Sequence, residues 1–326
     1  MAWEGSWTAR DQPDGLKPRV FASRRFPDQV RAELERSFDL DLHDSEWPPE
    51  REELLRRARG ADGLMLMLTD RVDDELLDAA GPQLRVVANY AVGIDNVDLE
   101  ACRRRGVVVS NTPDVLTEAT AELTIALILA LLRRVAEGDR LIRRGQPWIW
   151  APNLMLGQGL ASLVLGLVGY GKIGQAVARL GEAHGMQVVH TRRGGGLPLD
   201  ELLATADVVS LHLPLSGDTR HLIDAAALAR MKPGAVLVNT SRGPIVDEAA
   251  LAEALAQGRI AGAALDVFEH EPDVHPDLLG LESVVLVPHL GSATLETRQA
   301  MGMLCVEALR AVLLESRPPQ NAVNPP

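Results

Sequence analysis

The chain has 326 residues, of which 46% are hydrophobic and 24% are charged, and its net charge at pH 7 is −12. This length and apolar content suffice for two domains, each with a sizeable core. The acidic balance argues against a general nucleic-acid binder or a protein of the anionic membrane surface, although it leaves room for a local basic pocket that binds an anion.

The two cysteines, Cys102 and Cys305, stand in neither a metal-binding nor a disulfide-framework spacing. We therefore expect free thiols in a reducing compartment and no metal site. The apolar run at 123–132 is too short to span a bilayer, and residues 1–17 lack the apolar stretch of a signal peptide. These features predict a cytoplasmic protein with a flexible N-terminal extension over residues 1–17 and no membrane partner.

Short apolar runs alternate with segments of helical periodicity along almost the whole chain, which is typical of an α/β fold with parallel sheets. A first series of strands ends at a long apolar helix, 117–137, with Thr117 as its predicted N-cap. A second series follows, and a last helix spans about 294–314. We expect two separate sheets, although strand count alone does not assign the last helix to either. The predicted strands are 19–24, 63–68, 85–90 and 106–111, then 163–169, 187–190, 207–213, 235–240, 262–267 and 284–289.

The segment GLVGYGKIGQAVA, residues 166–178, carries Gly169, Gly171 and Gly174 in the spacing G-x-G-x-x-G. A predicted strand precedes it and a predicted helix follows, which is the order that dinucleotide binding requires. Glycine permits the tight turn and the close approach of a pyrophosphate, and the helix start at Lys172 and Ile173 supplies N–H groups. The segment predicts a nicotinamide dinucleotide site; the alternative is a glycine-rich turn that binds nothing.

The end of the next strand has no acidic residue. An acid about 20 residues beyond the glycine loop usually binds the adenosine ribose hydroxyls, whereas this chain has HTRRGG at 190–195. Thr191 can donate a hydroxyl, and Arg192 and Arg193 can make charge-assisted bonds to a 2′-phosphate. We therefore predict NADP(H) as the preferred cofactor, with NAD(H) possible. The alternative is a solvated basic turn.

Polar side chains follow the other strands of the second series. Because ligands bind outside the carboxyl ends of strands in open α/β sheets, we expect these side chains to meet in one crevice. An arginine can hold a carboxylate, a histidine can donate a proton, and a neighbouring acid keeps that imidazole protonated and oriented. This set suits hydride transfer to a 2-oxo acid, although each residue alone has a simpler explanation. The residues are His212 and Pro214, Thr240, Ser241 and Arg242, Asp266, Glu269 and Glu271, and His289 and Gly291.

From about residue 18 to its end, the chain resembles the D-isomer-specific 2-hydroxyacid dehydrogenases. Other segments are most similar to the glyoxylate/hydroxypyruvate reductase (glycerate dehydrogenase) branch, which the basic TRR also fits. Besides the glycine loop, the family signatures are 231–251, 264–272 and 287–294, and the branch-like segments are 68–73, 88–99 and 111–123.

The resemblance implies a role for each of several residues. Arg242 would bind the substrate, Glu271 would tune the histidine, and His289 would be the acid/base. The backbone at Val92 and Gly93 would hold the substrate carboxylate, in a pocket that Leu68 lines. The residues implied on the nicotinamide side of the cofactor are Thr117, Thr240, Asp266 and Gly291.

The resemblance also implies the architecture. A Rossmann-type, doubly wound NAD(P) domain, 117–298, would be inserted in a flavodoxin-like substrate domain made of 18–116 and 299–326. Family members are usually homodimers built through the nucleotide domain and an arm near 117–150. Trp148 or Trp150 of that arm can reach the partner's substrate pocket, but ordinary packing explains either residue equally well.

The leading interpretation is an NADPH-preferring reductase of glyoxylate and hydroxypyruvate that forms glycolate and D-glycerate. Another D-2-hydroxyacid, 3-phosphoglycerate or phosphite dehydrogenase would use the same trio of residues. A formate dehydrogenase is disfavoured, because that group places glutamine where Glu271 stands. A dinucleotide-sensing corepressor on the same fold is the alternative from another class. One departure from the family is Ser162, Leu163 and Val164, where a glycine, a basic residue and a threonine are usual.

Overall fold

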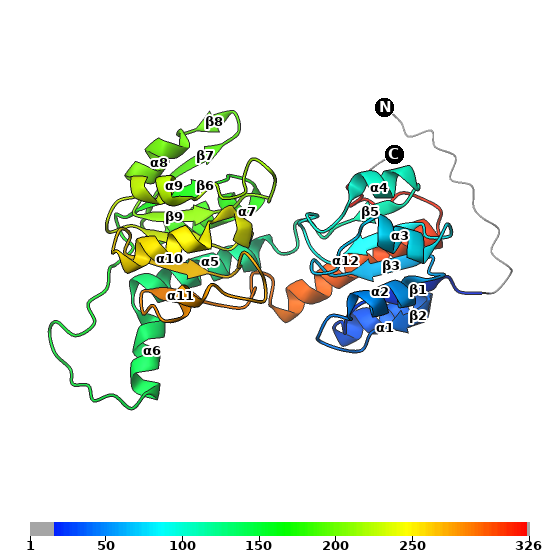
Figure 1. Cartoon of the computed structure of the whole chain (residues 1–326), viewed down its shortest axis with the longest axis horizontal. Coiled ribbons are helices and arrows are strands. Elements are labelled where there is room, and N and C mark those ends of the chain that lie inside the picture. The colour runs from blue at the N-terminus through cyan, green and yellow to red at the C-terminus, as the bar shows by residue number, and fades with distance from the viewer. Residues whose placement is uncertain (1–15, 325–326) are drawn as a thin grey trace. The chain divides into compact units, whose positions relative to one another are not determined.

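The computed structural model describes residues 16–324. The chain divides into two compact units (Figure 1). Unit 1 contains the residues up to 116 and those from 294 onward, and unit 2 contains residues 117–293. The N-terminal extension expected at residues 1–17 lies almost entirely outside the described residues. Within 16–324, no helix combines the length and the hydrophobicity needed to cross a membrane.

Unit 1 is built on a five-stranded parallel sheet of order β2-β1-β3-β4-β5. This is the 2-1-3-4-5 order of flavodoxin-like folds, in which the direction of the strand order reverses between the first and third strands. The strands are β1 (Arg19–Ala22), β2 (Asp39–Leu42), β3 (Gly63–Leu66), β4 (Val86–Asn89) and β5 (Val108–Ser110), and the helices are α1 (Asp28–Ser37), α2 (Arg51–Ala58), α3 (Asp74–Ala80), α4 (Leu99–Arg104) and α12 (Leu295–Leu313).

Helix α12 joins unit 1 as a whole. Thr294 is its N-cap and accepts a hydrogen bond from the N–H of Thr297. A Cβ at Gly63 of β3 would lie 2.8 Å from Leu309, so the helix packs directly on the sheet. The chain returns to unit 1 at residue 294, where α12 begins. The family resemblance implied a return at residue 299, which lies inside this helix.

Unit 2 has a seven-stranded sheet of order β12-β11-β10-β9-β6-β7-β8. Counted from β6, this is the 3-2-1-4-5-6 order of the Rossmann fold with one further strand. All pairs are parallel except β7 with the two-residue strand β8. The strands are β6 (Val164–Val168), β7 (Gln187–Arg192), β8 (Gly195–Gly196), β9 (Val208–Leu211), β10 (Val236–Asn239), β11 (Gly262–Leu265) and β12 (Val284–Leu286).

Helices cover both faces of this sheet, as in a doubly wound fold (Figure 1). One core joins the strands to α5 (Thr117–Leu132) and α7 (Lys172–Ala183). The other core joins the opposite face to α8, α9, α10 and α11. The bounds of these four are α8 (Leu199–Thr205), α9 (Ala225–Arg230), α10 (Glu248–Ala256) and α11 (Pro276–Leu279), and a short 3-10 helix spans Gly243–Ile245.

The long helix expected at 117–137 is two helices. Helix α5 ends at Leu132, and α6 (Val135–Arg143) follows a break at Arg134, whose φ of 54° is left-handed. A later segment of the chain caps the C-terminal end of α5, because the N–H of Gln158 donates a hydrogen bond to the carbonyl of Leu132. Thr117 is the first residue of α5 rather than its cap. Helix α6 and the segment after it project from the rest of unit 2 (Figure 1).

Candidate active site

The glycine loop of unit 2 joins β6 to α7 at the point where the strand order reverses. Gly169 has a φ of +100°, and an added Cβ would lie 2.3 Å from the carbonyl oxygen of His212, which follows β9. A Cβ at Gly174 would lie 2.4 Å from the carbonyl oxygen of Gly169. By contrast, Gly171 faces open space, and as the N-cap of α7 it leaves the first N–H groups of the helix without a side-chain cap. This cradle fits the pyrophosphate of a dinucleotide.

A hairpin of strands β7 and β8 carries the two arginines. Thr191 pairs with Gly196, and Arg192 pairs with Gly195, so Arg193 stands in the turn between the strands. The side chain of Arg193 is 89% exposed and forms an ion pair with Asp218 at 3.1 Å. The strand order places this hairpin beside the glycine loop, at the carboxyl end of β7, where a cofactor's adenosine ribose is bound in this fold.

A stacked ring pair links the glycine loop to this hairpin. The ring of Tyr170, inside the loop, lies 3.8 Å from the ring of His190 on β7, with an angle of 13° between their planes. Nothing in the sequence indicates that these two rings meet, because they are 20 residues apart. The stack holds the basic hairpin against the glycine loop.

Several of the residues expected at the nicotinamide form one hydrogen-bonded group. Asp266 accepts from the N–H groups of Leu290 and Gly291. Burial raises the pKa of the Asp266 carboxyl and outweighs these bonds. The bonds from α5 to this group come from Thr120, which donates to the carbonyl of Gly291, and from Thr124, whose hydroxyl lies 2.9 Å from that of Thr240. Thr117, the residue expected here, lies one turn earlier on α5.

His212 lies at the same edge of the sheet and is neutral at physiological pH. Its Nε2 is 2.9 Å from the hydroxyl of Ser210. Burial lowers the pKa of His212 to about 4. Pro214, two residues further, is exposed. Because this imidazole is uncharged, the positive end of the α7 dipole lies beside a neutral side chain and can attract an anion.

Glu271 and His289 are in direct contact. Nδ1 of His289 lies 2.9 Å from Oε2 of Glu271, and the other carboxylate oxygen accepts from the N–H of Phe268 at 3.0 Å. Burial raises the pKa of Glu271, but the hydrogen bond and charge of His289 outweigh it and hold that pKa below its ordinary value. His289 has a left-handed φ of 54°, a strained geometry that often marks functional residues.

Arg242 completes the trio at this edge. Its charge contributes to the lowered pKa of Glu271. The next residue, Gly243, is packed so tightly that an added Cβ would lie 1.8 Å from the carbonyl oxygen of Phe268. The segments that carry Arg242 and Glu271 are therefore interlocked through their backbones.

A buried acid that the sequence analysis missed supports the loop before and after Glu271. Glu248, the first residue of α10, is 5% exposed and accepts from the N–H groups of Glu269 and His275. Glu269, expected among the residues of the crevice, forms an ion pair with Arg220 and lies 2.6 Å from Nε2 of His221. No sequence motif distinguished Glu248 from an ordinary acid at a helix start.

Unit 1 contains the residues expected to hold a substrate carboxylate. The carbonyl of Val92 accepts from Asn111, and the carbonyl of Gly93 accepts from Asn89. No acceptor in the described part of the chain engages the N–H groups of Val92 or Gly93. Two adjacent amides in this condition can bind an anion. Leu68 is partly buried in the loop that follows β3.

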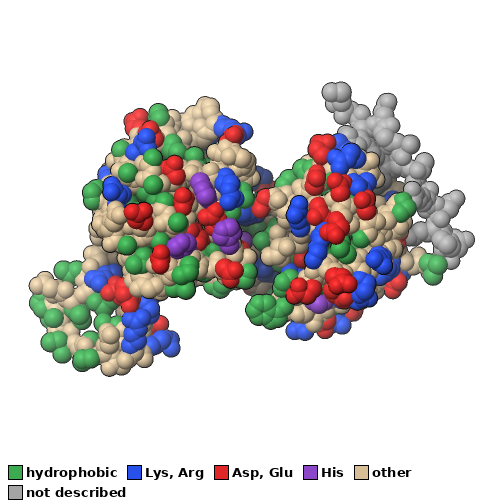
Figure 2. All heavy atoms as spheres, in the orientation of Figure 1, with side chains coloured by type: hydrophobic (Ala, Val, Ile, Leu, Met, Phe, Trp, Pro, Cys, Tyr) green, Lys and Arg blue, Asp and Glu red, His purple; other side chains and the backbone are tan. Residues whose placement is uncertain are grey.

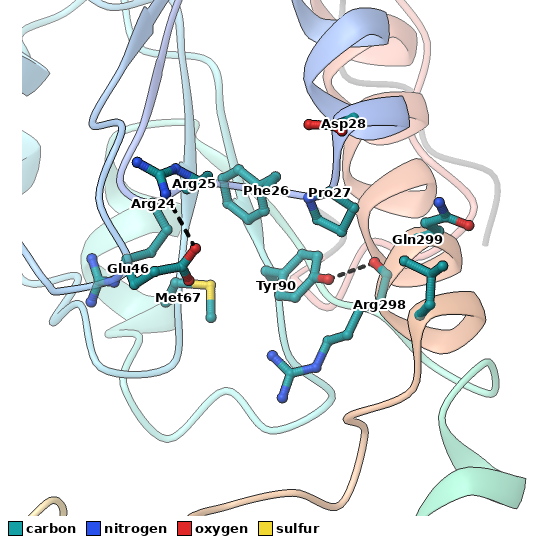
Figure 3. A pocket seen from close by; sticks show the side chains of 11 residues that line it. Arg24, Arg25, Phe26, Pro27, Asp28, Glu46, Met67, Tyr90, Arg298 and Gln299 are labelled. Atoms are coloured by element: carbon teal, nitrogen blue, oxygen red, sulfur yellow. Dashed lines mark hydrogen bonds and ion pairs between the residues drawn. The ribbon is translucent and has the colours of Figure 1, made fainter.

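A cavity of about 680 Å³ lies in unit 1 at the carboxyl ends of β1, β3 and β4. The rings of Phe26 and Tyr90, 5.2 Å apart, form part of its wall, with Arg24, Met67 and Arg298 around them (Figure 3). Met67 directly precedes Leu68, so the cavity adjoins the loop that was expected to line the substrate pocket. Its position matches the ligand crevice of flavodoxin-like sheets.

Trp148 lies in the segment after α6 and is not brought to the trio. It is 58% exposed, and its neighbours Ile149 and Trp150 are 76% and 84% exposed. Figure 2 shows hydrophobic side chains gathered on this projecting segment. Helix α6 itself has no buried residue.

The chain is similar to known proteins along nearly its whole length. The family model described as D-isomer specific 2-hydroxyacid dehydrogenase, NAD binding domain, matches residues 125–291. A glyoxylate reductase from Korarchaeum cryptofilum is 46% identical over 324 residues, which is 95% of this chain and 96% of the relative. The chain belongs to the D-isomer specific 2-hydroxyacid dehydrogenase family.

Solved structures support the same assignment for this 2-hydroxyacid dehydrogenase. A protein from Thermus thermophilus superimposes with a TM-score of 0.88 at 47% identity, covering 94% of this chain and 99% of that one. An NADPH-dependent glyoxylate/hydroxypyruvate reductase from Sinorhizobium meliloti, in complex with NADP and malonate, has a TM-score of 0.81 at 33% identity, covering 95% and 98%. The predicted family, branch and fold class are confirmed, and the protein is an NAD(P)-dependent dehydrogenase.

Proposed function

We propose that this dehydrogenase reduces glyoxylate and hydroxypyruvate to glycolate and D-glycerate, with NADPH as the preferred cofactor. The observation that carries the proposal is the contact between His289 and Glu271, with Arg242 interlocked beside them at the carboxyl edge of a Rossmann sheet. The similarity to proteins named glyoxylate reductase supports the choice of substrate.

The trio supplies what the reduction of a 2-oxo acid needs. The bound cofactor would provide the hydride that reaches the carbonyl carbon. Because Glu271 is ionised, Nδ1 of His289 carries a proton and donates to it, which leaves Nε2 to deliver a proton to the carbonyl oxygen. Arg242 holds the substrate and polarises its carbonyl group. The carbonyl then becomes a hydroxyl, and Glu271 stabilises the imidazolium before its proton is given up.

Unit 1 contributes the substrate carboxylate site in this proposal, and unit 2 contributes the cofactor site. The free N–H groups of Val92 and Gly93 bind the carboxylate, and Leu68 lies beside it. The cavity next to Met67 leaves room for the hydroxymethyl group of hydroxypyruvate, which glyoxylate lacks.

The preference for NADPH rests on the basic hairpin. Thr191, Arg192 and Arg193 stand where an acid would otherwise bind the ribose hydroxyls. The ion pair between Arg193 and Asp218 is almost fully exposed, so it is weak enough to be exchanged for a 2′-phosphate.

We extend the proposal to a homodimer in which the projecting segment of one protomer is covered by its partner. Five large apolar side chains of this segment are exposed, which is costly for a monomer in water. Trp148 would then lie near the partner's substrate pocket. The exposed side chains are Trp148, Ile149, Trp150, Leu154 and Leu156.

Steady-state kinetics of the purified protein test the proposal. Glyoxylate, hydroxypyruvate and pyruvate are each assayed with NADPH and with NADH. High kcat/KM for the first two acids with NADPH is the expected result. Activity with NADH alone contradicts the role given to the basic hairpin but keeps the dehydrogenase. No turnover of any acid contradicts the proposed reaction and favours phosphite oxidation or dinucleotide sensing.

A further inference from the structure

Two loops at the carboxyl edge of the unit 1 sheet are tied together by one amide side chain. Residues 67–70 follow β3 and contain Leu68, and residues 90–96 follow β4 and contain Val92 and Gly93. The side-chain nitrogen of Asn96, in the second loop, lies 3.2 Å from the carbonyl oxygen of Met67 and 2.9 Å from that of Asp70. The same nitrogen is 3.1 Å from the side-chain oxygen of Asn89.

Asn89 carries this link to the amides that would bind the substrate. Its own side-chain nitrogen donates to the carbonyl of Gly93 at 2.9 Å, and the residue is fully buried. A continuous set of hydrogen bonds therefore runs from the β3 loop through Asn96 and Asn89 to Gly93. It holds the carbonyl of Gly93 toward the interior and leaves the neighbouring N–H groups unengaged.

A buried ion pair fixes the other end of the set. Asp70 is 3% exposed, and its carboxylate accepts from the N–H of Met67 at 2.8 Å and from the hydroxyl of Ser23. The guanidinium of Arg24 lies 3.3 Å from the same carboxylate and donates to the hydroxyl of Thr69 at 2.8 Å. Arg24 is one of the residues around the cavity of unit 1 (Figure 3).

The ion pair in this set contributes little to the free energy of unfolding. A buried ion pair gains little net free energy over apolar side chains of the same volume, because both charges lose their hydration. What it provides is a fixed geometry. Here every member of the set holds one of the two loops, and the loops contain the three residues proposed to receive the substrate.

We infer that Asn96, braced by the buried Arg24–Asp70 pair and by Asn89, is a positioning residue that holds the β3 and β4 loops as one rigid receptor for the substrate carboxylate. The inference rests on the proposed function and deepens it. Asn96 touches no substrate; it acts by fixing where the N–H groups of Val92 and Gly93 lie. A misplacement of about 1 Å in such a receptor can lower kcat/KM by as much as about 100-fold, and because Asn96 acts on carboxylate binding, we expect the loss mainly in KM.

The substitution Asn96→Ala tests the inference, with Gln83→Ala as the matched control. The side-chain amide of Gln83 also joins two segments of unit 1, by donating to the carbonyls of Ala61 and Ala80, but it lies on neither substrate loop. Both variants lose an amide that bridges two backbone segments. Only Asn96→Ala removes the hydrogen-bonded link to Gly93.

Five quantities are measured for each variant: kcat and KM for glyoxylate, the affinity of the NADPH complex for oxamate by fluorescence titration, the Kd of NADPH alone, and the melting temperature. Asn96→Ala should raise KM and weaken oxamate binding by about tenfold or more, with a much smaller change in kcat and none in the Kd of NADPH. The uncharged ester methyl glyoxylate should lose much less kcat/KM than glyoxylate does. Gln83→Ala should leave all these values close to those of the wild type.

Three results would overturn the inference. The first is that Asn96→Ala matches Gln83→Ala in KM and oxamate binding, and the second is that acid and ester lose activity equally. The third is that only the melting temperature changes, which would make the network purely structural. If Asn96→Ala does not fold, Asn96→Ser, which keeps a shorter donor, is measured in its place with the same expectations. A wild-type protein that neither reduces glyoxylate nor binds oxamate refutes the proposed function itself, and the inference with it.

Discussion

Nδ1 of His289 lies 2.9 Å from a carboxylate oxygen of Glu271, and both residues belong to the same unit of the protein. The histidine reaches this acid from a backbone in the left-handed region, held by its N–H bond to the carbonyl of Asp266. The pair is therefore fixed by local structure, before any substrate or second unit is considered. Its chemistry can be tested residue by residue.

Replacing His289 by alanine should lower kcat for glyoxylate by about 10²- to 10⁴-fold, because the proton donor to the new hydroxyl is lost. The Kd of NADPH should stay unchanged, since the glycine loop lies elsewhere on the sheet. Stopped-flow or steady-state kinetics, together with a cofactor titration, measure both. Near-normal turnover in this variant would remove His289 from the mechanism.

Glu271→Gln should destabilise the protein at neutral pH and much less in acid. The pKa of Glu271 in the folded protein lies below its ordinary value of 4.5, so ionised Glu271 contributes stability above that value, and the contribution is lost as the pH falls through the folded pKa. Urea unfolding of the wild type and the variant from neutral pH down to about pH 3 should show the difference in free energy of unfolding shrinking. If the difference in free energy of unfolding between wild type and variant stays constant over this pH range, the pKa of Glu271 is not lowered in the folded protein.

The same substitution should also change the pH dependence of the reaction. Without the carboxylate, the imidazolium loses its partner, so the pH above which reduction declines should move to a lower value. The profile of kcat/KM against pH for glyoxylate measures this limit. An unshifted profile with reduced kcat would mean that Glu271 orients the ring without stabilising its charge.

Arg192→Asp should lower the preference for NADPH over NADH. Loss of a charge-assisted bond to the 2′-phosphate costs roughly 1.5–3 kcal/mol, which corresponds to a change of about 10- to 150-fold in the ratio of kcat/KM values. Arg230→Asp is the control, because Arg230 is an exposed arginine in the last turn of α9 that pairs with Asp200 and has no proposed role in cofactor binding. If both variants keep the wild-type ratio, the hairpin does not bind the phosphate.

Neither cysteine should react with thiol reagents in the folded protein. Cys102 and Cys305 are fully buried, and burial raises the pKa of Cys102 to about 12 and that of Cys305 further still. The thiolate, which is the reactive form, is therefore absent near neutral pH. Labelling with a disulfide reagent should be negligible until urea unfolds the protein and then reach both thiols. Rapid labelling accompanied by loss of activity would contradict this burial.

The features that could be read from the sequence are those set by local chemistry. The glycine spacing at 169–174 needs only a strand, a loop and a helix in order, and the structure has all three. The trio could be found because Arg242, Glu271 and His289 each follow a strand, and parallel strands present their ends at one edge. The assignment of the last helix to unit 1 came from the family resemblance, since no local pattern indicates where a helix docks.

Other features depended on tertiary contacts that leave no local pattern. Strand β2 was missed because it is only four residues long, and its position at the edge of the sheet leaves it without the continuous apolar run of the other strands. The break between α5 and α6 is set by a chain segment that returns about 25 residues later. Glu248 and Asn96 look like ordinary polar residues until the backbones that they hold are known. The bonds of Thr120 and Thr124 to Gly291 and Thr240 could not be foreseen, because they depend on how α5 packs on the sheet.

The tight packing of Gly243 against Phe268 has a consequence for changing this enzyme's substrate range. A side chain at position 243 would push apart the two segments that carry Arg242 and Glu271, so the part of unit 2 that holds the proposed trio tolerates little alteration. Under the proposed function, libraries directed at Met67, Leu68 and Val92 would vary which acid is accepted without altering Gly243 or the trio.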